Sequence, residues 1–201
     1  MTDHLVDQLA QLLDTTGQLV AGIGDEQWTA PTPCTEWSVR DLVDHLVAGN
    51  LLFAGILSGR VTMADAGRLR GVDQLNGDQL GDRPVAAYRA AADAVVSAAG
   101  RPGVQGQTFT LPVGTVPGVV ALHLRLTEVL VHGWDLARAT GQVVAFPDDV
   151  VVQELEFTRG ALSLVPAGAT PFAPPRPVRD EAPAIDRLAA CLGRDVTPNR
   201  A

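Results

Sequence analysis

The feature that most constrains the fold is an apolar spacing of three and four residues. Over residues 4–23 it aligns one stripe made of Leu5, Leu9, Leu12, Leu13, Leu19, Val20 and Ile23. This spacing predicts an amphipathic helix with one buried face. Comparable stripes with helix start and stop residues predict further helices over 38–57, 84–99, 117–140, 148–161 and 184–192. The sequence therefore predicts an all-α protein, a four-helix bundle with long connections and a short C-terminal capping helix.

The connections between these helices are rich in proline and glycine. Two prolines predict an extended segment over residues 28–35, and five glycines predict a long connection with a short helical turn over 59–83. We also expect a short strand within 104–115 and an extended proline-rich strap over 166–183. The predicted organisation is a bundle over residues 1–164, followed by a strap and helix over 165–201 that pack back onto it.

The charge of the chain excludes several classes of partner. The formal net charge is −8, and all 15 basic residues are arginine. Such a surface disfavours nucleic acid and anionic membranes. The apolar runs are too short for a membrane span, and residues 1–24 have no secretory pattern. Cys34 and Cys191 are too few for a disulfide framework, so we expect a reducing cytoplasm.

A carboxylate and an imidazole stand four residues apart in the predicted helix 117–140. Glu128 and His132 share one face of that helix, and the apolar neighbours suggest that this face points inward. His45 lies at the core edge of the helix 38–57. Together the three residues make a candidate metal site with room left for water or substrate. Asp135 is placed to accept the second N–H of the His132 ring.

Other interpretations of the same residues remain open. Arg125, three residues before Glu128, could neutralise that carboxylate without a metal, leaving His132 as a hydrogen-bonded core histidine. Cys34 is an alternative nucleophile or thiolate ligand, but about 15 Å of mostly helical rise separates it from His45. His123 lies on the opposite side of its helix from His132. Tryptophans 28, 37 and 134 are interpreted as core or helix-staple residues.

Two segments resemble a known family. The run Trp28-Thr29-Ala30-Pro31-Thr32-Pro33-Cys34-Thr35-Glu36-Trp37-Ser38-Val39-Arg40-Asp41-Leu42-Val43-Asp44-His45-Leu46 resembles the N-terminal motif of the mycothiol-dependent maleylpyruvate isomerase family, within the DinB-like metal-binding four-helix bundles. Residues 125–141, with Glu128, His132 and Trp134-Asp135-Leu136, resemble its second motif. The ending over residues 186–195 is similar to that of a small uncharacterised actinobacterial subfamily.

The resemblance implies a divalent metal, zinc or alternatively nickel, held by His45, Glu128 and His132. It also implies mycothiol as a thiol cofactor that is presented to an electrophile. The family's isomerases carry a further C-terminal α/β domain, whereas a proline-rich strap and one short helix follow here. We therefore do not expect maleylpyruvate isomerisation itself.

Three hypotheses follow from the sequence. The first is a cytoplasmic, metal-dependent thiol transferase or isomerase that takes a small-molecule thiol and a small electrophile. The second is a non-catalytic metal-binding or ligand-sensing bundle, and the third is a purely structural bundle with Glu128 paired to Arg125. The sequence leaves the catalytic residues, the role of Cys34 and a homodimer open.

Overall fold

The computed structural model describes residues 4–35, 37–61, 78–111, 114–164 and 172–197. The α-helices are α1 (His4–Ala21), α2 (Val39–Leu57), α4 (Pro84–Ala99), α5 (Gly118–Thr140), α6 (Asp148–Ser163) and α7 (Ala184–Cys191). Two short 3-10 helices, η1 (Asp25–Thr29) and η3 (Val104–Gly106), and one antiparallel hairpin of β1 (Thr108–Leu111) and β2 (Gly114–Pro117) lie between them. The prediction of an all-α protein is confirmed, with the predicted strand present as a hairpin.

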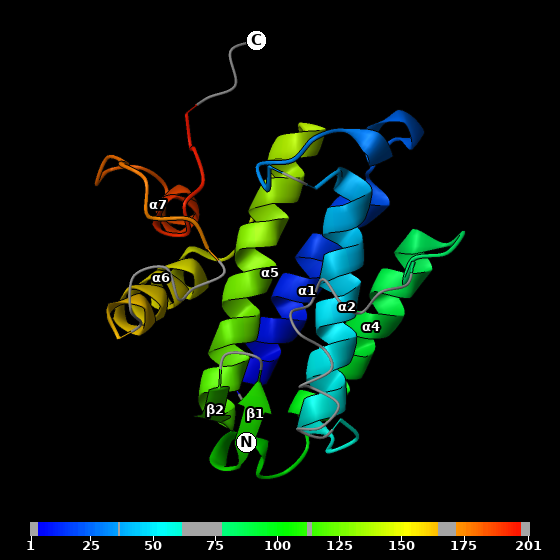
Figure 1. Cartoon of the computed structure of the whole chain (residues 1–201), viewed down its shortest axis with the longest axis vertical. Helices are drawn as coiled ribbons and strands as arrows, with labels where there is room; N and C mark the ends of the chain where they lie inside the picture. The colour runs from blue at the N-terminus through cyan, green and yellow to red at the C-terminus, as the bar shows by residue number, and fades with distance from the viewer. Residues whose placement is uncertain (1–3, 36, 62–77, 112–113, 165–171, 198–201) are drawn as a thin grey trace.

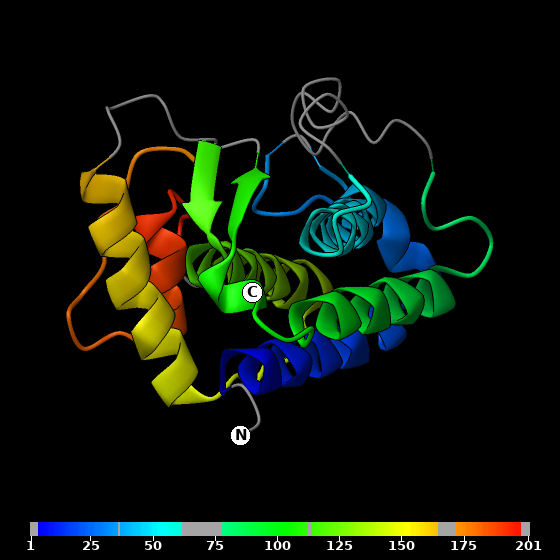
Figure 2. The same cartoon turned by 90° about the horizontal axis from the view of Figure 1, so that it is seen from below.

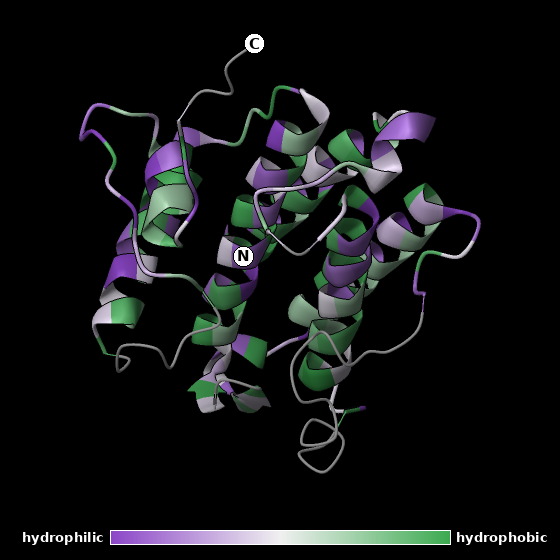
Figure 3. Ribbon diagram, turned by 45° about the horizontal axis from the view of Figure 1, so that its top comes forward, coloured by the Kyte–Doolittle hydropathy of each residue, from purple (hydrophilic) through white to green (hydrophobic). Residues whose placement is uncertain are grey.

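Helices α1, α2, α4 and α5 form the four-helix bundle (Figure 1). Each packs against two others, in the order α1, α4, α2, α5 and back to α1. The core is built mainly from leucines that are fully shielded from solvent, among them Leu9, Leu12, Leu42, Leu46, Leu126 and Leu130. Figure 3 shows hydrophobic and hydrophilic residues alternating along these helices, as the apolar stripes require.

Helices α6 and α7 lie beside the bundle, next to α5 (Figure 2). Helix α7 packs against both α6 and α5, and the indole Nε1 of Trp134 on α5 donates a hydrogen bond of 2.8 Å to Asp186 Oδ1 on α7. Trp134 therefore joins α5 to the C-terminal helix. Among the described helices, none combines the length and the apolar character that a membrane crossing requires.

The helix starts follow the sequence signals closely. Ser38 Oγ accepts the Asp41 N–H at 3.3 Å, and Asp41 Oδ2 accepts the Ser38 N–H at 2.9 Å, so α2 begins with a capping box. Helix α6 differs from prediction by one residue. Pro147 is its N-cap and its carbonyl accepts the Val151 N–H at 3.1 Å, so Asp148 is the first helical residue instead of the cap.

The predicted extended segment 28–35 is wrong at its start, because η1 continues to Thr29. Residues 30–32 contain no helix, and a β-bridge joins Pro31 to Ser38. The prediction is also wrong at its end, because residues 33–35 bend and turn back toward α2, with the Trp37 N–H bonded to the Cys34 carbonyl at 2.8 Å. Most of the predicted long connection, residues 62–77, and residues 165–171 of the predicted strap lie outside the described residues. Residues 173–178 contain no helix or strand, as the strap prediction requires.

Candidate metal centre

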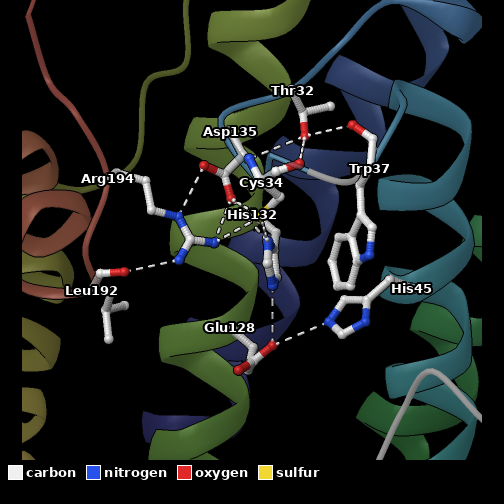
Figure 4. A network of polar contacts seen from close by, with 9 residues as sticks. All are labelled: Thr32, Cys34, Trp37, His45, Glu128, His132, Asp135, Leu192 and Arg194. Atoms are coloured by element: carbon white, nitrogen blue, oxygen red, sulfur yellow. Dashed lines mark hydrogen bonds and ion pairs between the residues drawn. The ribbon is translucent and has the colours of Figure 1, made fainter. Parts of the chain in front are cut away.

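The three predicted metal ligands meet between α2 and α5. Glu128 Oε2 lies 3.4 Å from His45 Nε2 and 3.3 Å from His132 Nε2. One ligand atom from each residue lies within 4.8 Å of the other two. Figure 4 shows both imidazoles directed at the same carboxylate from separate helices. The i, i+4 spacing and the position of His45 at the core edge therefore bring three donors to one point.

The distances from Glu128 to the two imidazoles are long for hydrogen bonds and are also compatible with ligands that share one metal ion. A good N–H···O bond spans about 2.7–3.2 Å. Ligands on a tetrahedral zinc ion, at bond lengths of about 2.0–2.2 Å, stand about 3.3–3.5 Å apart. The observed nitrogen–oxygen distances of 3.4 and 3.3 Å lie in the second range. The donor set, two imidazoles and a carboxylate, is also one that zinc accepts.

The centre is buried on one side and partly open on the other. The side chain of His132 is 4% exposed, whereas those of His45 and Glu128 are 13% and 24% exposed. Access from solvent is therefore greatest at the carboxylate. A group that approaches the three donors there does not have to displace the core.

Trp37 covers the two histidine rings. Its ring centroid lies 4.4 Å from that of His45 and 5.8 Å from that of His132, while the two imidazoles meet edge to face at 4.8 Å (Figure 4). The interpretation of Trp37 as a core or staple residue misses this contact. Trp37 precedes Ser38, the N-cap of α2, and its ring lies against His45, which is in the second turn of that helix.

Asp135 holds the other edge of the His132 ring. Its Oδ2 lies 3.0 Å from His132 Nδ1, so the hydrogen bond leaves Nε2 free to face Glu128 and His45. Asp135 is fully buried and also accepts two hydrogen bonds from Arg194, 2.8 Å from Nη2 and 3.2 Å from Nε. Sequence reasoning proposed the role of Asp135 and missed Arg194.

Cys34 lies on this second edge as well. Its Sγ is 3.3 Å from Asp135 Oδ2 and 3.9 Å from His132 Nδ1, and it accepts a hydrogen bond of 3.0 Å from Arg194 Nη2. The distance of about 15 Å predicted from helical rise applies only to Cys34 and His45. That prediction does not address His132 on α5, against which the loop before α2 folds.

The pKa values within the cluster follow from burial and from these hydrogen bonds. Burial acts to raise the pKa of Glu128, but bonds from His132 and His45 hold it well below its ordinary value. Burial acts to lower the pKa of His132, yet Asp135, Cys34 and Glu128 together raise it well above the ordinary 6.5. For His45 burial prevails and the pKa is lowered. Without a metal, a proton is therefore held more strongly by His132 than by His45.

Arg125 does not pair with Glu128. Among the described residues it has no carboxylate within ion-pair distance; it is 1% exposed and its Nη2 donates to the Leu46 carbonyl at 3.4 Å. Burial lowers its pKa. The alternative of a metal-free pair between Arg125 and Glu128 is therefore wrong. His123 bonds Glu154 Oε1 at 2.7 Å and takes no part in the cluster, as its helix phase predicts.

Fold and site together define a helical bundle with a candidate metal centre of two imidazoles and one carboxylate. The sequence model of the family described as the mycothiol maleylpyruvate isomerase N-terminal domain matches residues 9–137, which include all three candidate ligands. The chain belongs to this family, and its fold is the DinB-like four-helix bundle.

Relatives and solved structures agree with this assignment. An uncharacterised protein of Mycobacterium tuberculosis, found in two strains, is 37% identical over 197 residues, which cover 98% of this chain and all of that protein. The crystal structure of the mycothiol-dependent maleylpyruvate isomerase superimposes with a TM-score of 0.61 at 15% identity, covering 77% of this chain and 68% of that one. A histidine-to-alanine mutant of that enzyme gives the same TM-score at 14% identity. At these identities the two structures support the fold alone.

Proposed function

We propose that the chain is a metal-dependent thiol transferase or isomerase that acts on a small electrophile. The thiol that it uses is mycothiol. The observation that carries the proposal is the convergence of His45, Glu128 and His132, whose ligand atoms lie within 4.8 Å of one another, with Glu128 Oε2 3.4 and 3.3 Å from the two imidazole nitrogens. The family membership supports mycothiol as the thiol.

Each residue of the centre would have a separate role in holding the ion. His45, Glu128 and His132 would hold the ion, and Asp135 would keep the Nε2 of His132 turned toward it through the bond to Nδ1. Two neutral imidazoles and one carboxylate leave a divalent ion with about one unit of positive charge. Such an ion lowers the pKa of a bound thiol, so that the thiol reacts as the thiolate.

The surroundings of the donors suit a small anionic sulfur. Trp37 shields the faces of both imidazoles from water, and the partly exposed side of Glu128 leaves a path for the thiol and its acceptor. On the far edge of the His132 ring, Arg194 places a positive charge within hydrogen-bond distance of Asp135 and Cys34.

Metal content and turnover test the proposal. The purified protein should contain about one zinc or nickel ion per chain, and His45→Ala should lose it, whereas His4→Ala, at an exposed histidine of α1, should keep it. The loaded protein should then turn over a panel of small electrophiles with mycothiol. Equal metal content in both variants would contradict the proposed ligands. Tight metal binding with no turnover would favour the alternative function, a non-catalytic metal-binding or ligand-sensing bundle.

A further inference from the structure

Arg194 reaches the metal centre from outside the segment that matches the family model, residues 9–137. It follows α7 and is 8% exposed. Its Nη1 donates to the Leu192 carbonyl at 3.0 Å, and its guanidinium carbon lies 5.8 Å from the centre of the Phe172 ring. Its own N–H donates to the Ala189 carbonyl at 3.0 Å. The guanidinium is therefore fixed in position by the C-terminal segment.

The chain offers a metal ion a second group of ligands on the far edge of the same imidazole. Cys34, His132 and Asp135 also each provide one ligand atom within 4.8 Å of the others. A thiolate, an imidazole and a carboxylate form a donor set that zinc and related ions bind readily. His132 belongs to both groups, with Nε2 facing Glu128 and Nδ1 facing Asp135.

The guanidinium of Arg194 contacts two of the three residues of this second group. Its Nη2 lies 3.0 Å from Cys34 Sγ and 2.8 Å from Asp135 Oδ2, so one nitrogen contacts two of the three donors (Figure 4). A guanidinium stays charged at any physiological pH and binds a carboxylate through two N–H groups. The negative charge of buried Asp135 is thus already balanced by the chain itself.

We propose that Arg194 is the resident cation of the Cys34–His132–Asp135 group. It excludes a metal ion from that group and holds Asp135 on His132 Nδ1, so that one divalent ion binds at His45, Glu128 and His132. Arg194 is a positioning residue, and its effect on the metal rests on the proposed function of that site. With an ion bound at His45, Glu128 and His132, the His132 ring is neutral, so without Arg194 the buried carboxylate of Asp135 lacks a cation and a second divalent ion restores the charge balance.

Cobalt titration of the full chain tests the proposal, because a thiolate bound to Co²⁺ gives a charge-transfer band that imidazole and carboxylate ligands do not. The wild type should bind one Co²⁺ per chain without this band. Arg194→Ala should show the band and take up a second ion, which displaces the Cys34 thiol proton and the Nδ1 proton of His132 to solvent and leaves that ring as a bridging imidazolate. Its first site should weaken about 10-fold as Asp135 loses its support. Adding Cys34→Ala to Arg194→Ala should abolish the band. Arg179→Ala, at an exposed arginine before α7, is the matched control and should behave as the wild type.

Further variants keep the test decisive if Arg194→Ala folds poorly. Arg194→Met retains an apolar stem beside Phe172 and should show the same thiolate band. Arg194→Lys retains a cation and should return to one ion with no band. A thiolate band in the wild type, or a folded Arg194→Met that binds one ion without the band, would overturn the proposal.

The same titration separates this inference from the proposed function. A wild type that binds no Co²⁺, next to an Arg194→Ala variant that binds it with the thiolate band, would reject the proposed centre and still support exclusion by Arg194. One ion in both proteins, with equal affinity and no band, would leave the proposed centre standing and reject the role of Arg194.

Discussion

Two aspartate–arginine pairs in this chain have the same nitrogen–oxygen distance and opposite surroundings. Arg194 Nη2 lies 2.8 Å from Asp135 Oδ2 in the interior, where the two side chains are 9% and 0% exposed. Arg40 Nη2 lies 2.8 Å from Asp78 Oδ2 at the surface, where they are 41% and 55% exposed. Changing each aspartate to asparagine removes the charge while nearly preserving the shape. The pairs therefore compare a buried and an exposed aspartate–arginine contact at the same nitrogen–oxygen distance.

The expected losses of unfolding free energy differ several-fold. Breaking a buried pair by removing one partner costs about 3–5 kcal/mol, because the remaining charge stays buried without compensation. In Asp135→Asn the new amide also presents an N–H₂ group toward Arg194 or His132, both of which are donors there. An exposed pair contributes about 0–1 kcal/mol. We expect Asp135→Asn to fall in the first range and Asp78→Asn in the second.

Urea denaturation of the metal-free protein at pH 7, with a chelator present, measures both losses. Each variant is compared with the wild type in the same buffer, and the slope of the free energy against urea shows whether the transition stays two-state. Zinc affinity of Asp135→Asn should fall about 10- to 100-fold, since the bond that orients His132 is weakened. Similar stability losses in the two variants would refute the argument that burial controls the strength of these pairs.

Two further predictions concern the pH dependence and the packing of the bundle. The folded-state pKa of His132 is raised, so its contribution to stability is complete below about pH 6.5 and is lost as the pH rises through the folded value. The unfolding free energy of chelated protein should thus fall above pH 6.5, and His132→Gln should flatten that fall; a rise with pH in the wild type would contradict it. Gly133→Ala would place a Cβ 2.6 Å from Phe146 Cζ and 3.1 Å from Thr16 Oγ1. Overpacking of about 1–3 kcal/mol outweighs the gain in helix propensity of about 1 kcal/mol, so thermal denaturation should show a lower midpoint, and an unchanged or higher one would contradict this.

The helices were predictable because their signals are local. The apolar stripe of α1, the capping box of Ser38 and Asp41, and Pro84 at the start of α4 each act within a few residues. The placement of α6 and α7 beside α5 depends on contacts such as the bond from Trp134 to Asp186, which join residues 52 apart in the sequence. No periodicity within one helix contains that information.

The candidate centre was predictable in part for the same reason. Glu128 and His132 share a helix face by spacing alone, and Asp135 follows one turn later. His45 was proposed as the third ligand because it lies at the core edge of its own helix, but spacing alone could not show that this helix packs against α5. The contacts of Cys34 and Arg194 could not be predicted, because Cys34 meets His132 across 98 residues and Arg194 meets Cys34 across 160 residues. The direction of Arg125 was equally undetermined, since Leu46 lies on another helix.

X-ray absorption at the zinc edge of the zinc-loaded protein tests the central claim most directly, because it reports the atoms bound to the ion. Coordination by His45, Glu128 and His132 predicts nitrogen and oxygen neighbours at about 2.0–2.2 Å, with the outer scattering of two imidazoles. His45→Ala should release the ion and lose this signal. A sulfur at about 2.3 Å, or a spectrum with no imidazole, would contradict the account.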